Sequence, residues 1–337
     1  MNIKDIQRVA RKYLIDDHLS VVVLRPEDQL QQKGKDAQEV AQAEIIKEEF
    51  SNGLKVLLKE DRTLPIATIF LTMRAGSREE PEEQNGLNQL TADLWPQGTG
   101  SWSSQQVAQM VEARGARLSS SGGYNSMSLR MDFLSEDLKF ALDLMEAFVK
   151  SPRFAPEDFT NQKNQQIANV KEQEDSIVQT GMNNLRQLLF LQHPLRNDIS
   201  GTVEGLENIT RPQVVDFYSK FLTADHMVIS LFGDIDSVSA LTELKKRFGN
   251  IPKRKVDLSE FREDLPKELR EKLLTMDKEQ AAVLIGMRAP DIYDQDRYGM
   301  EVISSILGSA LSGRMFVKIR EELGNAYFFD QKYDAAR

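Results

Sequence analysis

Gly86-Leu-Asn-Gln-Leu-Thr-Ala-Asp-Leu-Trp-Pro-Gln-Gly-Thr99 is the segment that decides the fold of this 337-residue chain. It predicts a helix over 86–96. Residues three and four apart lie on the same face of a helix, so positions 89, 92 and 93 are neighbours. Those positions are Gln89, Ala92 and Asp93. This face therefore carries one amide, one methyl group and one carboxylate.

The segment resembles the active-site helix of the pitrilysin/insulinase family of zinc peptidases, whose pattern reads G-L-x-H-x-x-E-H-x-x-x-x-G-T. In this inverted zinc motif (the inverzincin motif) the two His hold the metal and the Glu activates its water. The resemblance places Gln89, Ala92 and Asp93 at those three positions. A further Glu from a later helix completes the family's site, and its position falls on Asn169. The resemblance therefore implies a degenerate zinc motif in this chain.

The histidines lead to the same expectation without any family. The chain has three, His18, His193 and His226, and no Cys. No two of the His residues are spaced to share a helical face, whereas a catalytic zinc usually has three protein ligands drawn from His, Cys and carboxylates. We expect no metal or other cofactor in this chain. His193 is predicted to be a turn residue beside a helix end.

Composition limits the classes of function. The length predicts two or more domains. A net charge of −9 argues against nucleic-acid binding, which needs a clustered basic face. No apolar run has the length of a membrane span and no leader is recognisable, so we expect a soluble protein without a signal peptide in this fragment, periplasmic or cytoplasmic. The basic run Lys253-Arg-Lys255 is predicted to be a solvated connector.

The chain repeats itself. Residues 2–25 match 210–233, each predicting a helix, a turn and an apolar strand, and the strand over 67–75 matches 281–289. The repeat predicts a unit of about 215 residues, of which one copy is complete. The predicted divisions are the tail of a preceding unit over 1–28, a linker over 29–45, the complete unit over 46–262, and the first part of another unit over 263–337.

The predicted elements give an α+β fold. Strands are predicted at 54–60, 66–75, 116–122, 124–133 and 226–233. Helices are predicted at 86–96, 103–114, 135–150, 156–175, 177–192, 211–221 and 236–248. The family resemblance implies the same fold, a mostly antiparallel sheet with helices packed on one face, with repeated units that together form a clamshell.

A second motif lies near the C-terminus. Residues 307–327 are similar to the family pattern L-G-x-x-x-S-S-R-L-F-x-x-x-R-x-x-x-G-x-A-Y. The resemblance implies that Arg320 and Tyr327 hold the substrate and stabilise the oxyanion opposite the zinc site. Guanidinium and phenol groups can both donate to a developing oxyanion. On the residues alone, Arg320 could instead pair with Glu321, and Tyr327 could simply pack.

A Ser/Gly-rich stretch provides candidate substrate contacts. In the family the equivalent strand edge pairs with the peptide, which makes Ser121, Gly122, Gly123 and Asn125 candidates for substrate binding. The alternative is that this stretch is only a hairpin turn.

These patterns together resemble the non-catalytic half of split or fused family members. The resemblance implies that the chain is part of a longer protein, that it closes a peptide-binding chamber, and that a zinc-bearing half, fused or separate, performs the hydrolysis. The expected partners are therefore that half and unfolded peptides. The alternatives are a structural scaffold without peptidase activity and a peptide-binding module without a catalytic partner.

Overall fold

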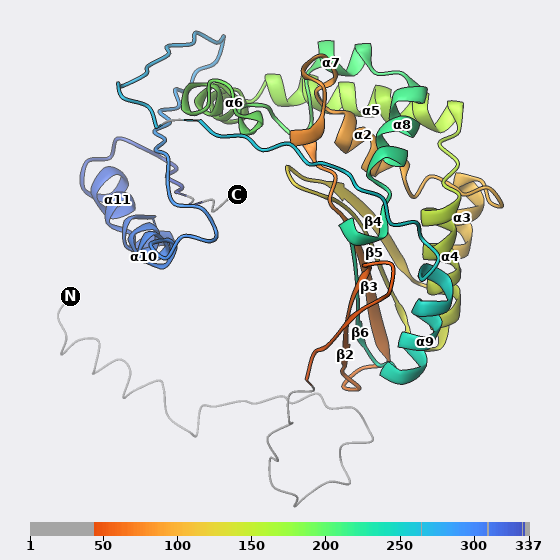
Figure 1. Cartoon of the computed structure of the whole chain (residues 1–337). Helices are drawn as coiled ribbons and strands as arrows, with labels where there is room; N and C mark the ends of the chain where they lie inside the picture. The colour runs from red at the N-terminus through yellow and green to blue at the C-terminus, as the bar shows by residue number, and fades with distance from the viewer. Residues whose placement is uncertain (1–43, 264, 309, 332, 334–337) are drawn as a thin grey trace, which may run out of the picture. The chain divides into compact units, whose positions relative to one another are not determined.

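The structure is a computed structural model that describes residues 44–263, 265–308, 310–331 and 333 (Figure 1). The predicted tail over 1–28 and nearly all of the linker predicted over 29–45 lie outside the described residues, as does His18. In the part that is described, no helix combines the length and the apolar character needed to cross a membrane.

Six strands form a single sheet in the order β1-β2-β6-β3-β5-β4. The strands are β1 (Ile46–Glu49), β2 (Lys55–Glu60), β3 (Ile66–Met73), β4 (Arg117–Gly122), β5 (Met127–Leu134) and β6 (Met227–Gly233). Only the β2–β6 pair is parallel; the other neighbours run antiparallel. The sheet is therefore mostly antiparallel, as the sequence predicts.

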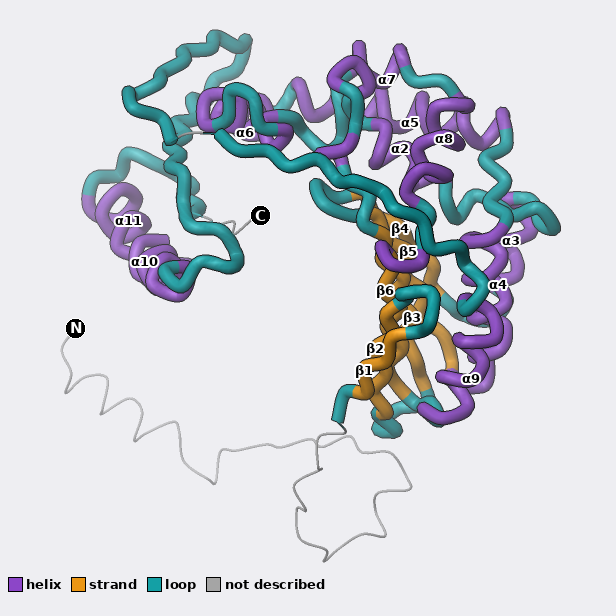
Figure 2. Tube along the Cα trace, in the orientation of Figure 1, coloured by secondary structure: helices purple, strands orange, loops and turns teal. Residues whose placement is uncertain are grey.

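One face of this sheet is buried because successive side chains of a strand point to opposite faces. On β3, Ala67, Ile69, Leu71 and Met73 are buried while Phe70 between them is exposed. The β3–β6 register sets Ile69 opposite Leu231 and Leu71 opposite Ile229, so the buried rows continue from strand to strand. The helices over residues 104–112, 138–150 and 237–248 cover this face, as Figure 2 shows. The α+β fold with helices on one side of the sheet is thus confirmed.

The helices of the complete unit follow the predicted order. They are α2 (Leu87–Leu94), α3 (Ser104–Glu112), α4 (Leu138–Lys150), α5 (Pro156–Glu174), α6 (Ile177–Leu189), α7 (Val203–Asn208), α8 (Arg211–Phe221) and α9 (Ser237–Phe248). The sequence missed the short elements β1 and α7. The strand predicted over 124–133 begins three residues later, at Met127, because the Gly123 N–H donates to Ser126 O and closes a turn there.

Helix α2 is fixed at the centre of this layer by Trp95, which directly follows it. Trp95 is fully buried, and its indole N–H donates to Phe148 O at 3.0 Å. Its ring lies edge-to-face on Tyr218 of α8, with the centroids 5.5 Å apart, and the Tyr218 hydroxyl donates to Val149 O at 2.9 Å. Helices α2, α4 and α8 are therefore locked together behind the sheet.

Residues 252–263, here called the strap, leave α9 as an extended segment and run back over the complete unit (Figure 1). The run predicted as a solvated connector is exposed, and its Arg254 guanidinium also donates to Ser219 O and Leu222 O at the end of α8. Lys253 and Lys255 are exposed, as predicted.

The C-terminal part differs from prediction at one element. Residues 281–289, predicted as a strand, are extended but pair with no other strand in the described part of the chain. A β-ladder needs a neighbour, which the repeat alone does not supply. A helix, α10 (Arg297–Gly308), follows this segment, and α11 (Arg314–Phe316) leads into a π-helical turn over Val317–Glu322.

Candidate functional site

Gln89 and Asp93, both half-buried, form a bridge on one face of α2. Gln89 Nε2 donates to both carboxylate oxygens of Asp93, each at 2.9 Å, and Gln89 Oε1 accepts the Gly122 N–H at 3.1 Å. One carboxamide therefore links a turn of α2 to the end of β4. Burial raises the pKa of Asp93, and the hydrogen bonds from Gln89 oppose that rise.

The residues at the positions of the family's zinc motif do not fit a catalytic zinc. Ala92 is fully buried and has no donor atom. The Gln89 amide nitrogen has no lone pair to offer a metal, and both of its protons point at Asp93. Asn169, on α5, accepts a hydrogen bond from Gln165 at 2.9 Å on an exposed surface. A single carboxylate remains, whereas such a metal needs about three protein ligands.

Glu80 anchors the start of α2, and sequence reasoning missed it. Its carboxylate accepts the N–H groups of Asn88 at 2.6 Å and Gly86 at 3.1 Å, and the Asn85 side-chain amide at 3.2 Å. Gly86 has φ 104°, a left-handed conformation that lets the chain turn back toward Glu80. Burial raises the Glu80 pKa from 4.5 to about 7, against the three hydrogen bonds, which lower it.

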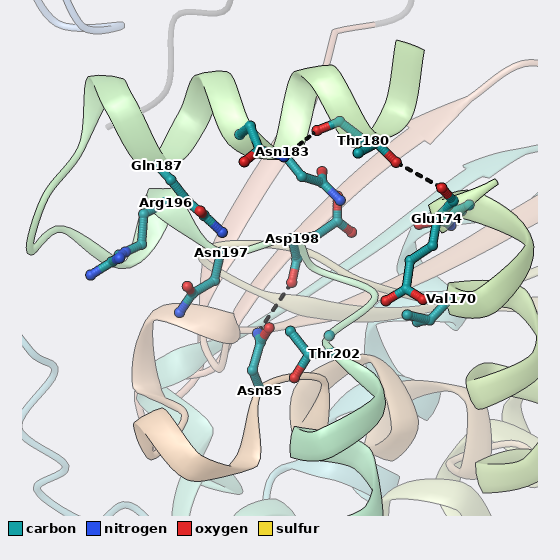
Figure 3. A pocket seen from close by; sticks show the side chains of 13 residues that line it. Asn85, Val170, Glu174, Thr180, Asn183, Gln187, Arg196, Asn197, Asp198 and Thr202 are labelled. Carbon is teal, nitrogen blue, oxygen red and sulfur yellow. Dashed lines mark hydrogen bonds between the residues drawn. The ribbon is translucent and has the colours of Figure 1, made fainter. Parts of the chain in front are cut away.

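A polar cavity of about 250 Å³ lies beside this anchor, between α5, α6 and the loop that precedes α7 (Figure 3). Asp198 fixes one wall, since it accepts hydrogen bonds from Arg186 at 2.7 Å and from Gln179 at 3.1 Å. Carboxamides dominate the lining: Asn85, Gln173, Asn183, Asn184, Gln187 and Asn197. The cavity contains no ring that would stack on a ligand and no cluster of acids that would hold a metal.

The predicted substrate-binding stretch forms the end of the edge strand β4 and the turn that follows. The Ser121 hydroxyl lies 2.9 Å from that of Ser128 on β5. The Gly122 N–H is taken by Gln89, and Gly123 O accepts from the Asn88 side chain at 3.0 Å. Asn125 Oδ1, in the turn, accepts from Arg78 at 2.8 Å. The hairpin turn is thus present, and its polar groups are already engaged within the chain.

Arg320 and Tyr327 lie side by side in the C-terminal part. The Arg320 guanidinium is 5.3 Å from the Tyr327 ring centroid and 5.0 Å from that of Phe316. Its Nε is 3.8 Å from a Glu321 carboxylate oxygen. The Tyr327 side chain is exposed. In the described residues no hydrogen bond or ion pair joins either side chain to α2 or α5.

His193 occupies a turn, as predicted. It precedes the 3-10 turn Pro194–Arg196, and its Nδ1 accepts the Leu195 N–H at 3.1 Å. The ring is buried and lies near two arginines, which sequence reasoning did not foresee.

Comparisons with known proteins agree with this geometry. A family model described as "Insulinase (Peptidase family M16)" matches residues 55–203, and one described as "Peptidase M16 inactive domain" matches residues 208–332. A Helicobacter pylori protein named "Non-peptidase homolog YmxG" is 27% identical over 274 residues, which cover 81% of this chain and 63% of that protein. The chain thus spans less than two thirds of that relative's length.

Two solved structures share the fold. A peptidase M16 inactive domain from Pseudomonas fluorescens superposes with a TM-score of 0.71 at 22% identity, over 84% of this chain and 69% of that one. A Helicobacter pylori protease superposes with a TM-score of 0.73 at 14% identity, over 88% and 72% of the two chains. Two consecutive models of one family match residues 55–203 and 208–332, and the solved structures share the fold: the chain belongs to the insulinase family, peptidase family M16.

Proposed function

We propose that this chain is the non-catalytic half of a zinc-dependent metalloendopeptidase. It closes the peptide-binding chamber, while another half, fused or separate, holds the zinc and the catalytic Glu. The observation that carries this proposal is the bridge from Gln89 to Asp93 and Gly122, which engages in hydrogen bonds two of the residues that the resemblance assigns to the zinc motif. The match to a model of inactive domains supports it.

The free edge of β4 is the proposed site of peptide contact. Amide groups along a strand point alternately to its two sides, so the outward direction of the Gly122 N–H implies that those of Leu118 and Ser120 also point outward. A groove of about 730 Å³ runs between this strand and α3, with Val107 and Val111 in its lining. An extended peptide can add to the edge there and place apolar side chains in the groove. At Gly122 it would have to displace Gln89.

Arg320 and Tyr327 are proposed to reach the substrate from the second unit. Both can donate hydrogen bonds to an oxygen that becomes negative when the peptide is attacked. Because Tyr327 is exposed and Arg320 is held between two rings, the pair forms a preformed donor surface.

The test measures zinc content and peptide cleavage for this chain alone and mixed with a separately produced family half that carries an intact H-x-x-E-H helix. The expected result is no cleavage by the chain alone and cleavage in the mixture above that of the zinc-bearing half by itself. The matched control is the same mixture with the catalytic Glu of the zinc-bearing half replaced by Gln. No gain on mixing, with complex formation shown by sedimentation, would favour a scaffold. One zinc per isolated chain would contradict the proposal.

A further inference from the structure

Five side chains from four separate segments stack in a row where the strap meets the complete unit. Arg288 lies over the Phe190 ring at 4.3 Å, and the Phe190 and His193 ring centroids are 5.5 Å apart. His193 meets Phe261 of the strap edge-to-face at 5.6 Å, and the Arg78 guanidinium lies 5.5 Å from the Phe261 ring centroid. The row Arg288–Phe190–His193–Phe261–Arg78 is here called the ladder. It has a cation at each end and an imidazole at its centre.

Glu263 ties the strap to the same place. Its carboxylate accepts three consecutive backbone N–H groups, those of Leu191 at 2.7 Å, Gln192 at 3.1 Å and His193 at 2.9 Å. Desolvation raises the pKa of Glu263, but these three bonds outweigh it and the pKa is lowered. The strap is therefore held by a charge on a cluster of backbone donors as well as by the ladder.

Arg78 connects the ladder to the hairpin turn of β4 and β5. One of its nitrogens donates to Asn125 Oδ1 at 2.8 Å, and the other is 3.4 Å from Ser259 O in the strap. The backbone near Arg78 is pressed on this turn, because a Cβ at Gly76 would lie 2.0 Å from Tyr124 O. Arg78 thus contacts both the strap and the turn at the end of the edge strand.

We infer that the ladder and Glu263 form a latch, which docks the strap on the complete unit only while His193 is neutral. Two features of the geometry require the neutral ring. Nδ1 accepts the Leu195 N–H, so a proton on Nδ1 would break that bond. A charged ring would also be repelled by the guanidinium groups of Arg78 and Arg288, and among the described residues the Glu263 carboxylate is the acid that acts on it.

The surroundings of His193 determine the direction of its pKa shift. Burial first, and then Arg78 and Arg288, lower the His193 pKa below 6.5, while Glu263 acts in the opposite direction. A group with a lowered pKa in the docked state stabilises that state above 6.5, and this contribution is lost as the pH falls through the docked-state pKa. The latch is therefore closed at neutral pH and released by acid. This inference goes beyond the proposed function, since it involves neither zinc nor peptide.

Hydrogen–deuterium exchange of the 337-residue chain tests the latch, because the amides of Leu191, Gln192 and His193 are protected by Glu263. We expect their protection factors, corrected for intrinsic exchange, to fall about tenfold between pH 7.5 and pH 5.0, because protonation of His193 destabilises the docked strap. His193→Asn keeps an acceptor for the Leu195 N–H but does not titrate, and its protection should stay within about twofold over the same range.

Two strap variants complete the test. Phe261→Leu removes the ring between His193 and Arg78 and should lower protection of the same amides at both pH values. Arg262→Ala, on the exposed neighbour, should leave protection unchanged. The Leu90 amide, bonded to Gly86 O within α2, reports whether each variant is folded. An equal loss of protection at acid pH in the parent chain and in His193→Asn would overturn the inference. So would protection factors of the parent chain that do not change with pH.

Discussion

Gln89→Met tests the bridge at the degenerate site, since it keeps the side-chain length but removes the amide donor and the carbonyl acceptor. The change leaves the part-buried Asp93 carboxylate and the Gly122 N–H without partners. We expect a loss of about 2 kcal/mol in the free energy of unfolding, within the range for an unsatisfied buried group. Urea denaturation at pH 7 measures it. Asp93→Asn retains an acceptor for Gln89 and should cost less than about 1 kcal/mol; equal losses in the two variants would contradict the bridge.

The raised pKa of Glu80 predicts that its contribution to stability falls as the pH rises. This is the opposite of the effect of His193 on the strap. The Glu80 pKa rises from 4.5 to about 7 on folding, so the folded state binds the proton more tightly than the unfolded state. The contribution to stability is complete below 4.5 and is lost as the pH rises through about 7. It amounts to about 3 kcal/mol across that interval.

The measurement for Glu80 is urea unfolding of the parent chain and of Glu80→Gln at pH 5.0, 6.5 and 8.0. Subtracting the two curves removes the titration of every other group. The difference in stability should change steadily with pH, because Gln does not ionise. A difference that is constant over the three pH values would show that Glu80 keeps an ordinary pKa.

At the scale of the element, α2 and α5 can be tested as a frame for metal ligands. The variant carrying Gln89→His, Ala92→Glu, Asp93→His and Asn169→Glu restores the family's ligand types. Positions 89, 92 and 93 share one face of α2, and α5 packs on α2, so we expect one zinc per chain by calorimetry. Leaving Asn169 unchanged is the control and should weaken binding. A folded variant that takes up no zinc would show that these positions do not converge.

Sequence periodicity was sufficient for the elements whose signals are local. The predicted 66–75 strand and 156–175 helix match β3 and α5 closely because alternation and a Pro at the helix start mark them. β1 was missed since its four residues are all exposed and carry no apolar pattern. The 281–289 segment has strand-like residues, but its pairing depends on neighbours that no local pattern encodes.

In the candidate site, too, the sequence predicted arrangements within one element but not contacts between elements. Helical spacing placed Gln89 and Asp93 on one face, but only the fold shows that Gln89 reaches Gly122, which lies in β4. No residue spacing pointed to Glu80 or Arg78. Glu80 accepts a backbone N–H from Gly86, and Arg78 donates to the side chain of Asn125, which is far away in the sequence. Sequence finds residues that share an element, whereas contacts between elements require the tertiary structure.

At the scale of the whole molecule, Arg320 and Tyr327 are proposed to stabilise the oxyanion although they lie far along the chain from α2. In a reconstituted enzyme, Arg320→Ala should lower turnover by about tenfold to a thousandfold, the range for losing one oxyanion donor. Tyr327→Phe keeps the ring that stacks on Arg320 but removes the hydroxyl, so a similar loss would identify hydrogen-bond donation as its role. Both effects should appear in kcat, because an oxyanion exists only in the transition state.

Glu321→Gln is the matched control for this pair, because it removes the ion-pair partner of Arg320 at 3.8 Å and leaves the guanidinium in place. An exposed pair of this kind contributes little to stability, so the variant should fold normally. If Arg320 serves the substrate, Glu321→Gln retains turnover while Arg320→Ala loses it. If Arg320 only makes contacts with Glu321 and the two rings, both variants retain turnover. The comparison therefore separates an assisting half of a peptidase from a scaffold that has kept the family's motif.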